Sequence, residues 1–230
     1  MSSLYIVGTP IGNLGDLSYR AVEILKNADL VACEDTRRTL KLLTSLGIRV
    51  PLISCRSQNE EAAALKILGA LDSGKKVAYC SDAGTPGLSD PGETMVRMAS
   101  SAGHTVIPVP GPSAFAALVS VSGGRGTQIF FEGFLSPRPG RRRSRLQELL
   151  ETGYAFVLYE SPFRILKLME DLATLDSSRY VCIGREMTKI HEEYIRGSAA
   201  EVRELVSASQ PRGEYAVFVA GFSHNEPSKL

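Results

Sequence analysis

The segment Ser81–Gly92 concentrates residues whose chemistry suits a small polar ligand. Its residues include three glycines, two prolines and the aspartates Asp82 and Asp90. Glycine lets a ligand approach the backbone closely and proline fixes the backbone, so the segment predicts a rigid loop with exposed amides and carbonyls. Amides suit a carboxylate, while carbonyls and carboxylates suit an ammonium group. An adenosine ligand that carries an amino acid and a sulfonium needs such a surface.

Three further loops follow short apolar runs, at Gly8–Asp16, Glu34–Thr39 and Pro110–Ala114. If each run is a strand of a parallel sheet, all four loops lie beyond the carboxyl ends of strands, where open α/β sheets bind ligands. The first loop has neither the Gly-Lys-Ser/Thr ending of a phosphate-binding loop nor the G-x-G-x-x-G spacing. The acidic pair Glu34 and Asp35 nevertheless follows about twenty residues later, where a dinucleotide fold places a ribose-binding carboxylate. A nicotinamide-binding protein therefore stays open as an alternative.

The elements that position these loops alternate between short strands and amphipathic helices. Strands are predicted at 4–7, 30–33, 52–54, 77–80 and 105–109, and helices at 17–26, 37–46, 59–71, from 91 onward and 113–121. This alternation predicts an α/β domain over residues 1–121, with a parallel sheet covered by helices on both faces. Asp90 is expected to cap its helix with Glu93 completing a capping box. For the first loop, the alternative to a ligand site is a tight turn that needs positive φ at Gly12 and Gly15, which does not explain Thr9-Pro10.

The glycine-rich segment Ser122–Gly126 predicts a domain boundary, with a second domain over residues 127–223. Strands are predicted there at 128–132, 156–159, 180–183, 193–195 and 215–220, and helices at 144–150, 164–172 and 201–206. Two strands flank Lys189 closely enough for a hairpin, which predicts a mixed sheet. The apolar run at 215–220 predicts its central strand. The chain is thus expected to form two small α/β domains.

The composition, 43% hydrophobic and 22% charged, is typical of a chain that buries cores in water. A formal net charge of +1 excludes a global basic field, so affinity for nucleic acid must come from local clusters. The four cysteines form no C-x-x-C pair, which predicts buried thiols without a disulfide or structural metal. No run approaches the roughly 20 apolar residues of a membrane span, and Leu4–Gly8 is too short for a signal peptide, so a cytoplasmic location is expected.

Six motifs occur together, in one order, along the chain. They are Thr9-Pro10-Ile11-Gly12-Asn13-Leu14-Gly15-Asp16, Glu34-Asp35-Thr36-Arg37, Ser81-Asp82-Ala83-Gly84-Thr85-Pro86, Pro110-Gly111-Pro112-Ser113-Ala114, Tyr159-Glu160-Ser161-Pro162 and Gly184-Arg185-Glu186-Met187-Thr188-Lys189. With these motifs the chain resembles, over essentially both domains, the ribosomal RNA small subunit methyltransferase I family, bacterial cytidine 2′-O-methyltransferases with the tetrapyrrole methylase fold. The resemblance implies S-adenosylmethionine held in a cleft between the domains, a cytidine ribose of small-subunit (16S) ribosomal RNA as methyl acceptor, and a homodimer.

Carried over position by position, the resemblance implies a set of cofactor contacts. They are Pro10, Ser81, Asp82, Ala83, Thr85, Ser113, Ala114, Glu160 and Met187. A ribose hydroxyl also needs a base, or a cation that stabilises the developing alkoxide. We take Glu186 or Asp35 as the base and Lys189 or Arg185 as the cation, with a set of surface ion pairs as the alternative for these four residues.

Residues 136–145 hold five arginines in an otherwise nearly neutral chain. They are Arg138, Arg141, Arg142, Arg143 and Arg145. Each can neutralise a phosphate, and positive charge at a helix start is unfavourable to the helix dipole, so the run predicts an RNA-binding surface, with Arg37 and Arg38 on the same rim. Two alternatives remain for function. One is a tetrapyrrole C-methyltransferase of the same fold, whose first loop typically reads Gly-x-Gly-Pro-Gly-Asp, and the other is a non-catalytic nucleotide-binding module.

Overall fold

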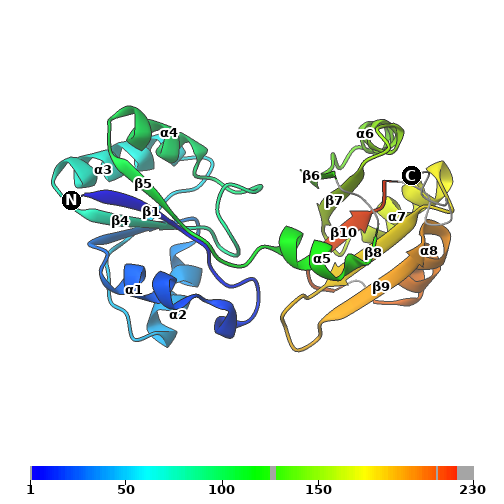
Figure 1. Cartoon of the computed structure of the whole chain (residues 1–230), viewed down its shortest axis with the longest axis horizontal. Coiled ribbons are helices and arrows are strands. Elements are labelled where there is room, and N and C mark those ends of the chain that lie inside the picture. The colour runs from blue at the N-terminus through cyan, green and yellow to red at the C-terminus, as the bar shows by residue number, and fades with distance from the viewer. Residues whose placement is uncertain (1, 125–127, 211, 222–230) are drawn as a thin grey trace. The chain divides into compact units, whose positions relative to one another are not determined.

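The computed structural model describes residues 2–124, 128–210 and 212–221, and in these residues ten strands form two separate sheets (Figure 1). The chain divides into two compact units between Ser113 and Ala114. Each unit has its own sheet, helices and buried core. The predicted α/β class is confirmed for both.

The five strands of the first unit are parallel and lie in the order β3-β2-β4-β1-β5. Their bounds are β1 (Ser3–Val7), β2 (Leu30–Cys33), β3 (Leu52–Ser54), β4 (Lys76–Cys80) and β5 (Thr105–Val109). Helices α3 (Glu60–Asp72) and α4 (Glu93–Ser101) cover one face, and α1 (Tyr19–Lys26) and α2 (Thr36–Ser45) cover the other (Figure 1). Because both faces are covered, the strands are apolar runs rather than alternating ones.

Successive residues of β4 serve the two cores in turn. Tyr79 packs in the cluster with Ile67 of α3 and Met95 of α4, whereas Cys80 packs in the cluster with Leu25 of α1 and Leu43 of α2. The register aligns the last residue of β1 with the last residues of β4 and β5. The loops that follow these three strands therefore leave the sheet at one edge.

The second unit has a mixed sheet in the order β6-β7-β10-β8-β9. Its elements are α5 (Ala114–Ser122), β6 (Ile129–Phe134), α6 (Pro139–Glu151), β7 (Ala155–Glu160), α7 (Ile165–Leu175), β8 (Tyr180–Arg185), β9 (Glu193–Ser198), α8 (Ala199–Ala208) and β10 (Tyr215–Val219). Strand β10 is buried along its whole length and runs antiparallel to β7 and β8, and β8 and β9 form an antiparallel hairpin around Lys189. The predicted central strand and hairpin are confirmed. Helix α6 begins five residues before the predicted start at Ser144, with Pro139 in its first turn, where proline is favoured.

The division between the units falls earlier than the expected boundary at Ser122–Gly126. Helix α5 packs against β10 and β8, with Leu118 buried beside Gly184, so α5 belongs to the second unit rather than to residues 1–121. Residues 125–127 and 222–223, which the predicted boundary and the 127–223 domain include, lie outside the described residues. Within the described residues, no helix is long and apolar enough to cross a membrane. Cys33, Cys55, Cys80 and Cys182 are buried free thiols, as expected.

Candidate functional site

The loops after β1 and β4 are joined directly at the edge of the first sheet. Thr9 and Gly84 form a two-bond bridge, in which the Thr9 amide donates to the Gly84 carbonyl at 2.9 Å and the Gly84 amide donates back at 3.1 Å. The buried Thr9 hydroxyl also lies 3.4 Å from the carbonyl oxygens of Ser81 and Gly84. The Thr9-Pro10 motif and the Ser81–Pro86 motif, far apart in sequence, thus form one surface.

Two glycines bring the loops after β1 and β5 into backbone contact. A Cβ atom built on Gly8 lies 2.7 Å from the backbone of Gly111, and one built on Gly111 lies 2.8 Å from the backbone of Gly8. No side chain fits there without separating the loops. The alternative in which Gly12 and Gly15 serve a turn with positive φ is wrong, since neither is among the described glycines in that region, whereas Gly84 has a φ of +82°.

Thr85 connects the loop after β4 to the loop after β5. Its hydroxyl lies 3.2 Å from the carbonyl oxygen of Gly111 and 3.0 Å from that of Pro112. A hydroxyl shared between two carbonyls holds the two loops at a fixed spacing. Ser113 follows at once and ends the first unit, and Ala114 is the first residue of α5.

Asp82 ties the loop after β4 to the start of α2. Its Oδ1 accepts a hydrogen bond from the Asp35 amide at 2.8 Å, and its Oδ2 lies 3.5 Å from a guanidinium nitrogen of Arg38. Asp35 in turn caps α2 by accepting from the Arg37 amide, and it pairs with the Arg37 guanidinium at 2.6 Å. These hydrogen bonds from Arg37 lower the pKa of the Asp35 carboxyl.

The expected capping of α4 by Asp90 is wrong, because a carboxylate from another helix occupies that role. Helix α4 begins at Glu93 with Gly92 before it, and Glu60 Oε1 of α3 accepts from the amides of Gly92 at 2.9 Å and Thr94 at 3.0 Å. Gly92 has a φ of +131°, and a Cβ there lies 2.7 Å from the Tyr79 ring. The chain therefore turns into α4 two residues after Asp90.

Asp90 is instead a partly buried carboxyl that lines a pocket of about 360 Å³ with Tyr79 and Arg97. Burial, together with the nearby charges of Glu34 and Asp82, raises the pKa of Asp90 to about 6. Burial also raises the pKa of Glu34. The loop after β4 therefore carries a carboxyl that titrates close to neutral pH.

Replacing Asp90 by asparagine is expected to stabilise the protein at pH 7.5 by about 1–2 kcal/mol, after a discount for partial exposure. The folded-state pKa of about 6 lies above the usual value, so the ionised carboxylate opposes folding at neutral pH. That penalty shrinks as the pH falls below 6, and most of it is lost by pH 4, where the folded state binds the proton and the unfolded state, whose pKa is the ordinary 3.8, begins to bind it. Urea unfolding at pH 7.5 and pH 4 measures the difference. An equal effect at both pH values would contradict the burial of this charge.

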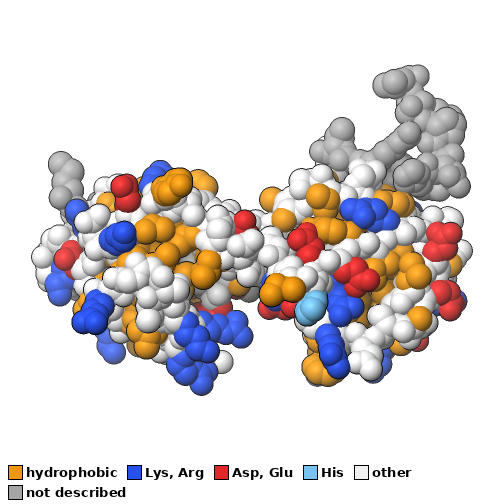
Figure 2. Space-filling view, turned by 90° about the horizontal axis from the view of Figure 1, so that it is seen from below, with side chains coloured by type: hydrophobic (Ala, Val, Ile, Leu, Met, Phe, Trp, Pro, Cys, Tyr) orange, Lys and Arg blue, Asp and Glu red, His pale blue; other side chains and the backbone are white. Residues whose placement is uncertain are grey.

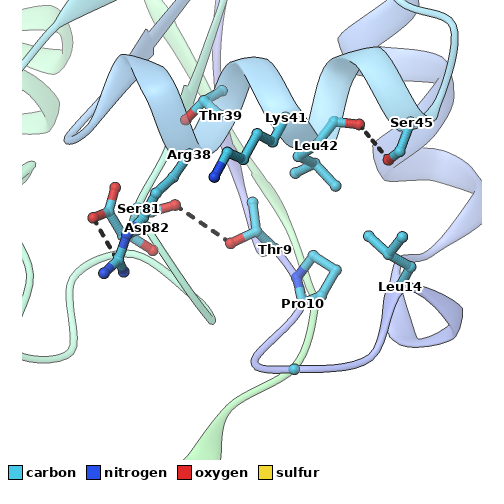
Figure 3. A pocket seen from close by; sticks show the side chains of 11 residues that line it. Thr9, Pro10, Leu14, Arg38, Thr39, Lys41, Leu42, Ser45, Ser81 and Asp82 are labelled. Carbon is cyan, nitrogen blue, oxygen red and sulfur yellow. Dashed lines mark hydrogen bonds and ion pairs between the residues drawn. The ribbon is translucent and has the colours of Figure 1, made fainter. Parts of the chain in front are cut away.

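A pocket of about 310 Å³ opens beside the joined loops of the first unit (Figure 3). The loop after β1 lines it with Pro10 and Leu14, helix α2 with Arg38 and Lys41, and the loop after β4 with Asp82. Figure 3 shows Lys41 extending from α2 toward the pocket, whereas Arg38 is directed to Asp82. The predicted residues Pro10, Arg38 and Asp82 are thus brought together.

Sequence reasoning missed the contribution of α2 to this pocket. Arg38, Lys41, Leu42 and Ser45 all line it, and their spacing of three, four and seven residues places them on one face of the helix. The buried Leu43 marks the opposite, core-facing side, whereas the buried Thr39 lies between the two sides and also lines the pocket. This helical spacing could have indicated the pocket from the sequence. The adjacent basic pair Arg37 and Arg38 instead favoured an RNA-binding rim.

In the second unit, the predicted cofactor residues Glu160 and Met187 follow β7 and β8 but differ in their surroundings. The Glu160 carboxylate is 3% exposed and is already engaged, by the Arg164 guanidinium at 2.6 Å and the Ser161 amide at 2.7 Å. Met187 is buried against Gly184, where any side chain would meet its sulfur. Both residues therefore hold the ends of their strands in place.

Three of the four catalytic candidates lie at the end of β8, and each is ion-paired. Lys189 Nζ lies 2.8 Å from Glu186 Oε1 and 2.8 Å from Glu214 Oε2, and Arg185 pairs with Glu193 at 3.1 Å. The hydrogen bond from Lys189 lowers the pKa of Glu186, whose backbone is held at a φ of +49°. These contacts correspond to the ion-pair alternative. Asp35, the fourth candidate, belongs to the first unit.

The arginine run does not form one uniform surface. Arg142 is 4% exposed and pairs with the buried Asp171 at 2.8 Å, so its assignment to an RNA-binding surface is wrong. Arg143 is exposed but bonds the same carboxylate, and Arg145 pairs with Glu132 and Glu148. Arg138 and Arg141 are exposed, and neither has an ion pair within the described chain. Among the residues that the structure describes, only these two arginines at the start of α6 carry a charge without an ion pair.

Comparisons with known proteins agree over most of the chain. Residues 3–203 match the family model of tetrapyrrole (corrin/porphyrin) methylases. The chain is 44% identical over 219 residues to a Borrelia garinii subsp. bavariensis protein named "Ribosomal RNA small subunit methyltransferase I", covering 94% of this chain and 98% of that one. It is also 44% identical over 221 residues to a Thermotoga maritima protein of the same name, covering 96% of this chain and 99% of that one.

Two solved structures share the fold. A cobalt precorrin-4 methyltransferase of cobalamin biosynthesis aligns with a TM-score of 0.72 at 16% identity, covering 95% of this chain and 94% of that one. The uroporphyrin-III C-methyltransferase of Thermus thermophilus aligns with a TM-score of 0.65 at 17% identity, covering 95% and 94%. At such identities the likeness establishes the fold and leaves the substrate open.

Proposed function

Because this chain belongs to the tetrapyrrole methylase family, we propose that it is an S-adenosylmethionine-dependent methyltransferase that acts on small-subunit ribosomal RNA. One observation carries the proposal: the chain is 44% identical to two proteins named for that activity, along 98% and 99% of their lengths. The porphyrinoid methyltransferases, by contrast, are only 16–17% identical. A methylase of RNA is therefore favoured over a tetrapyrrole C-methyltransferase.

The joined loops of the first unit fit such a donor. The close approach of Gly8 and Gly111 holds the loops after β1 and β5 together as one rigid surface, and Asp82 supplies a partly exposed carboxylate suited to an ammonium group. We assign donor contacts to Pro10, Ser81, Asp82, Ala83, Thr85, Ser113 and Ala114. Glu160 and Met187 stay predictions from the resemblance, and the engaged Glu160 carboxylate favours a positioning role over direct contact. When bound, the donor supplies a methyl group on a positive sulfonium.

The acceptor we propose is the ribose 2′-hydroxyl of a cytidine. In-line transfer depends mostly on holding hydroxyl, methyl and sulfur in a line, which a rigid loop surface favours. A hydroxyl also has to give up its proton. Asp35 or Glu186 accepts it and Lys189 or Arg185 provides the positive charge, and both carboxylates have a lowered pKa that keeps them ionised at neutral pH. Since Glu186 and Lys189 are bonded to each other, this role requires the substrate to replace that contact.

For RNA binding, we propose that backbone phosphates contact the arginines that have no ion pair within the described residues. Arg138 and Arg141 at the start of α6 carry charges with no intramolecular ion pair among the described residues. They therefore stay candidates for phosphate binding, whereas the buried Arg142 does not. Arg37 and Arg38 are exposed on the first turn of α2, although each also contacts an aspartate. Arg143 and Arg145 contribute less, because each is held by carboxylates.

Donor binding tests the assignment through two variants of Asp82. Asp82→Asn keeps an oxygen for the Asp35 amide but removes the charge, whereas Asp82→Ala removes both. If the carboxylate binds the donor ammonium, both variants lose about ten- to hundredfold in affinity for S-adenosylhomocysteine, as expected for a hydrogen bond to a charged group. Calorimetry measures the affinity. Thermal stabilisation of the wild type by S-adenosylhomocysteine but not by NAD excludes the nicotinamide alternative.

Two results would count against the proposal. If both Asp82 variants bind S-adenosylhomocysteine as the wild type does, Asp82 has no part in donor binding. If Asp82→Asn binds normally and only Asp82→Ala fails, the residue serves the loop connection to Asp35 and not the ligand. Stabilisation by NAD alone would favour a nucleotide-binding module.

A further inference from the structure

The pocket between the loop after β1 and helix α2 shares Pro10, Ser81 and Asp82 with the proposed donor surface, but the side that α2 lines has a composition that the donor does not explain. We propose that this pocket holds one nucleotide of the substrate RNA strand, with Lys41 binding its phosphate. The inference rests on the proposed function and adds a substrate site to it. It is carried by three features: an unpaired cation, an apolar wall and the charge of the helix that lines the pocket.

Lys41 is the unpaired cation. Its neighbours Arg37 and Arg38 are engaged by Asp35 and Asp82, whereas no ion pair reaches Lys41 within the described residues. In Figure 3 its ammonium end extends from α2 over the part of the pocket where Thr9 lies. A free ammonium at a pocket attracts an anion, and Lys binds phosphate as a point charge.

Apolar side chains form a wall beside this charge. Pro10, Leu14 and Leu42 line the pocket, and Leu14 is 55% exposed, which leaves apolar surface open to a ligand. The volume of about 310 Å³ lies within the range of small-ligand sites. A sugar or base can rest on this wall while its phosphate reaches the lysine, so the pocket matches the two-part chemistry of a nucleotide.

The charge of the pocket favours RNA over the donor. S-adenosylmethionine carries a positive sulfonium and a positive ammonium and has no phosphate. Helix α2 has basic residues and no acidic residue between Thr36 and Ser45, and Figure 2 shows Lys and Arg side chains gathered on the side of the first unit that α1 and α2 cover. Arg38 and Lys41 outnumber the one carboxylate of the pocket lining, Asp82, so a phosphodiester gains from the field on the α2 side, whereas a cationic group of the donor is favoured only next to Asp82.

Binding of a small-subunit ribosomal RNA transcript, measured without donor across a range of salt concentrations, tests the pocket. Lys41→Ala should remove one phosphate contact, lower the salt slope by about 0.7–0.9 and weaken binding about fivefold at 0.1 M salt. Lys41→Arg should retain most of the affinity. The matched control is Lys75→Ala, because Lys75 is exposed just before β4, at the opposite edge of the sheet. That control should bind RNA as the wild type does.

Calorimetry with S-adenosylhomocysteine separates the pocket from the donor site. Lys41→Ala should bind this ligand with unchanged affinity. A loss of that affinity would place the donor carboxylate at Lys41 and overturn the inference, and so would RNA binding by Lys41→Ala with the affinity and salt slope of the wild type. A wild-type protein that binds the transcript but methylates no RNA would refute the proposed function instead, because the binding assay needs no methyl transfer.

Discussion

Replacing Gly111 by alanine is expected to abolish measurable binding of S-adenosylhomocysteine. The new Cβ would lie 2.8 Å from the backbone carbon, Cα and oxygen of Gly8, and backbone atoms cannot rotate away as a side chain can. The loops after β1 and β5 must then separate, which disturbs the Thr85 hydroxyl between Gly111 and Pro112. Overpacking of this kind costs about 1–3 kcal/mol in stability. The loss of donor binding should exceed that cost, because the donor surface itself is displaced.

Gly69→Ala provides the matched control for this experiment. Gly69 lies in helix α3 with nothing within 4 Å of the position that a Cβ would occupy, so alanine should be neutral or stabilising by about 0.5–1 kcal/mol. Calorimetry of both variants, with thermal unfolding to confirm that each is folded, gives the comparison. Normal donor affinity in folded Gly111→Ala would show that the contact between these two loops does not shape the donor site.

Arg142→Ala is expected to destabilise the protein by about 3–5 kcal/mol, because it empties a buried site and leaves Oδ2 of the buried Asp171 carboxylate without its guanidinium partner. Arg142 and Asp171 pair at 2.8 Å with side chains that are each 5% exposed. Arg143 also bonds Asp171, but its side chain is 55% exposed and does not occupy the buried space that the Arg142 side chain fills. Urea unfolding measures the loss.

The adjacent Arg141→Ala should behave in the opposite way. Its side chain is exposed with no ion pair within the described chain, so stability should change by less than about 0.5 kcal/mol while affinity for RNA falls. The double variant Arg142→Met with Asp171→Leu should recover most of the stability lost in Arg142→Ala, because it removes both charges together. If Arg142→Ala unfolds at the wild-type urea concentration, the buried pair contributes nothing to the fold.

The architecture of the first unit could be predicted because its elements are locally encoded. Apolar runs such as residues 77–80 are buried on both faces of a parallel sheet, and the helices between them show regular apolar spacing. Because the strands are parallel, the loops at their carboxyl ends lie along one edge of the sheet. The sequence alone therefore predicts that Thr9, Asp82 and Gly111 lie near one another. The mixed sheet followed in the same way from the hairpin around Lys189 and the apolar strand 215–220.

Partners chosen across long sequence separations could not be predicted. Glu60 caps α4 from another helix, a choice that depends on how α3 packs, so the local capping signal at Asp90 was misleading. Arg141 and Arg142 are identical in type and adjacent, yet one is exposed and the other buried. In the structure, helical spacing with Leu146 and Leu149 places Arg142 on the apolar face of α6, and the position of Asp171 on α7 explains why a charge is tolerated there.

Transfer of a labelled methyl group is the most direct test of the proposed function. Purified protein is incubated with methyl-labelled S-adenosylmethionine and small ribosomal subunits from cells that lack this protein, and the RNA is digested to nucleosides for mass spectrometry. The expected result is label in 2′-O-methylcytidine from small-subunit RNA, and none when the subunits come from cells that contain the protein. Label on a base, or no label in RNA from a protein that binds S-adenosylhomocysteine, would contradict methylation of a ribose hydroxyl.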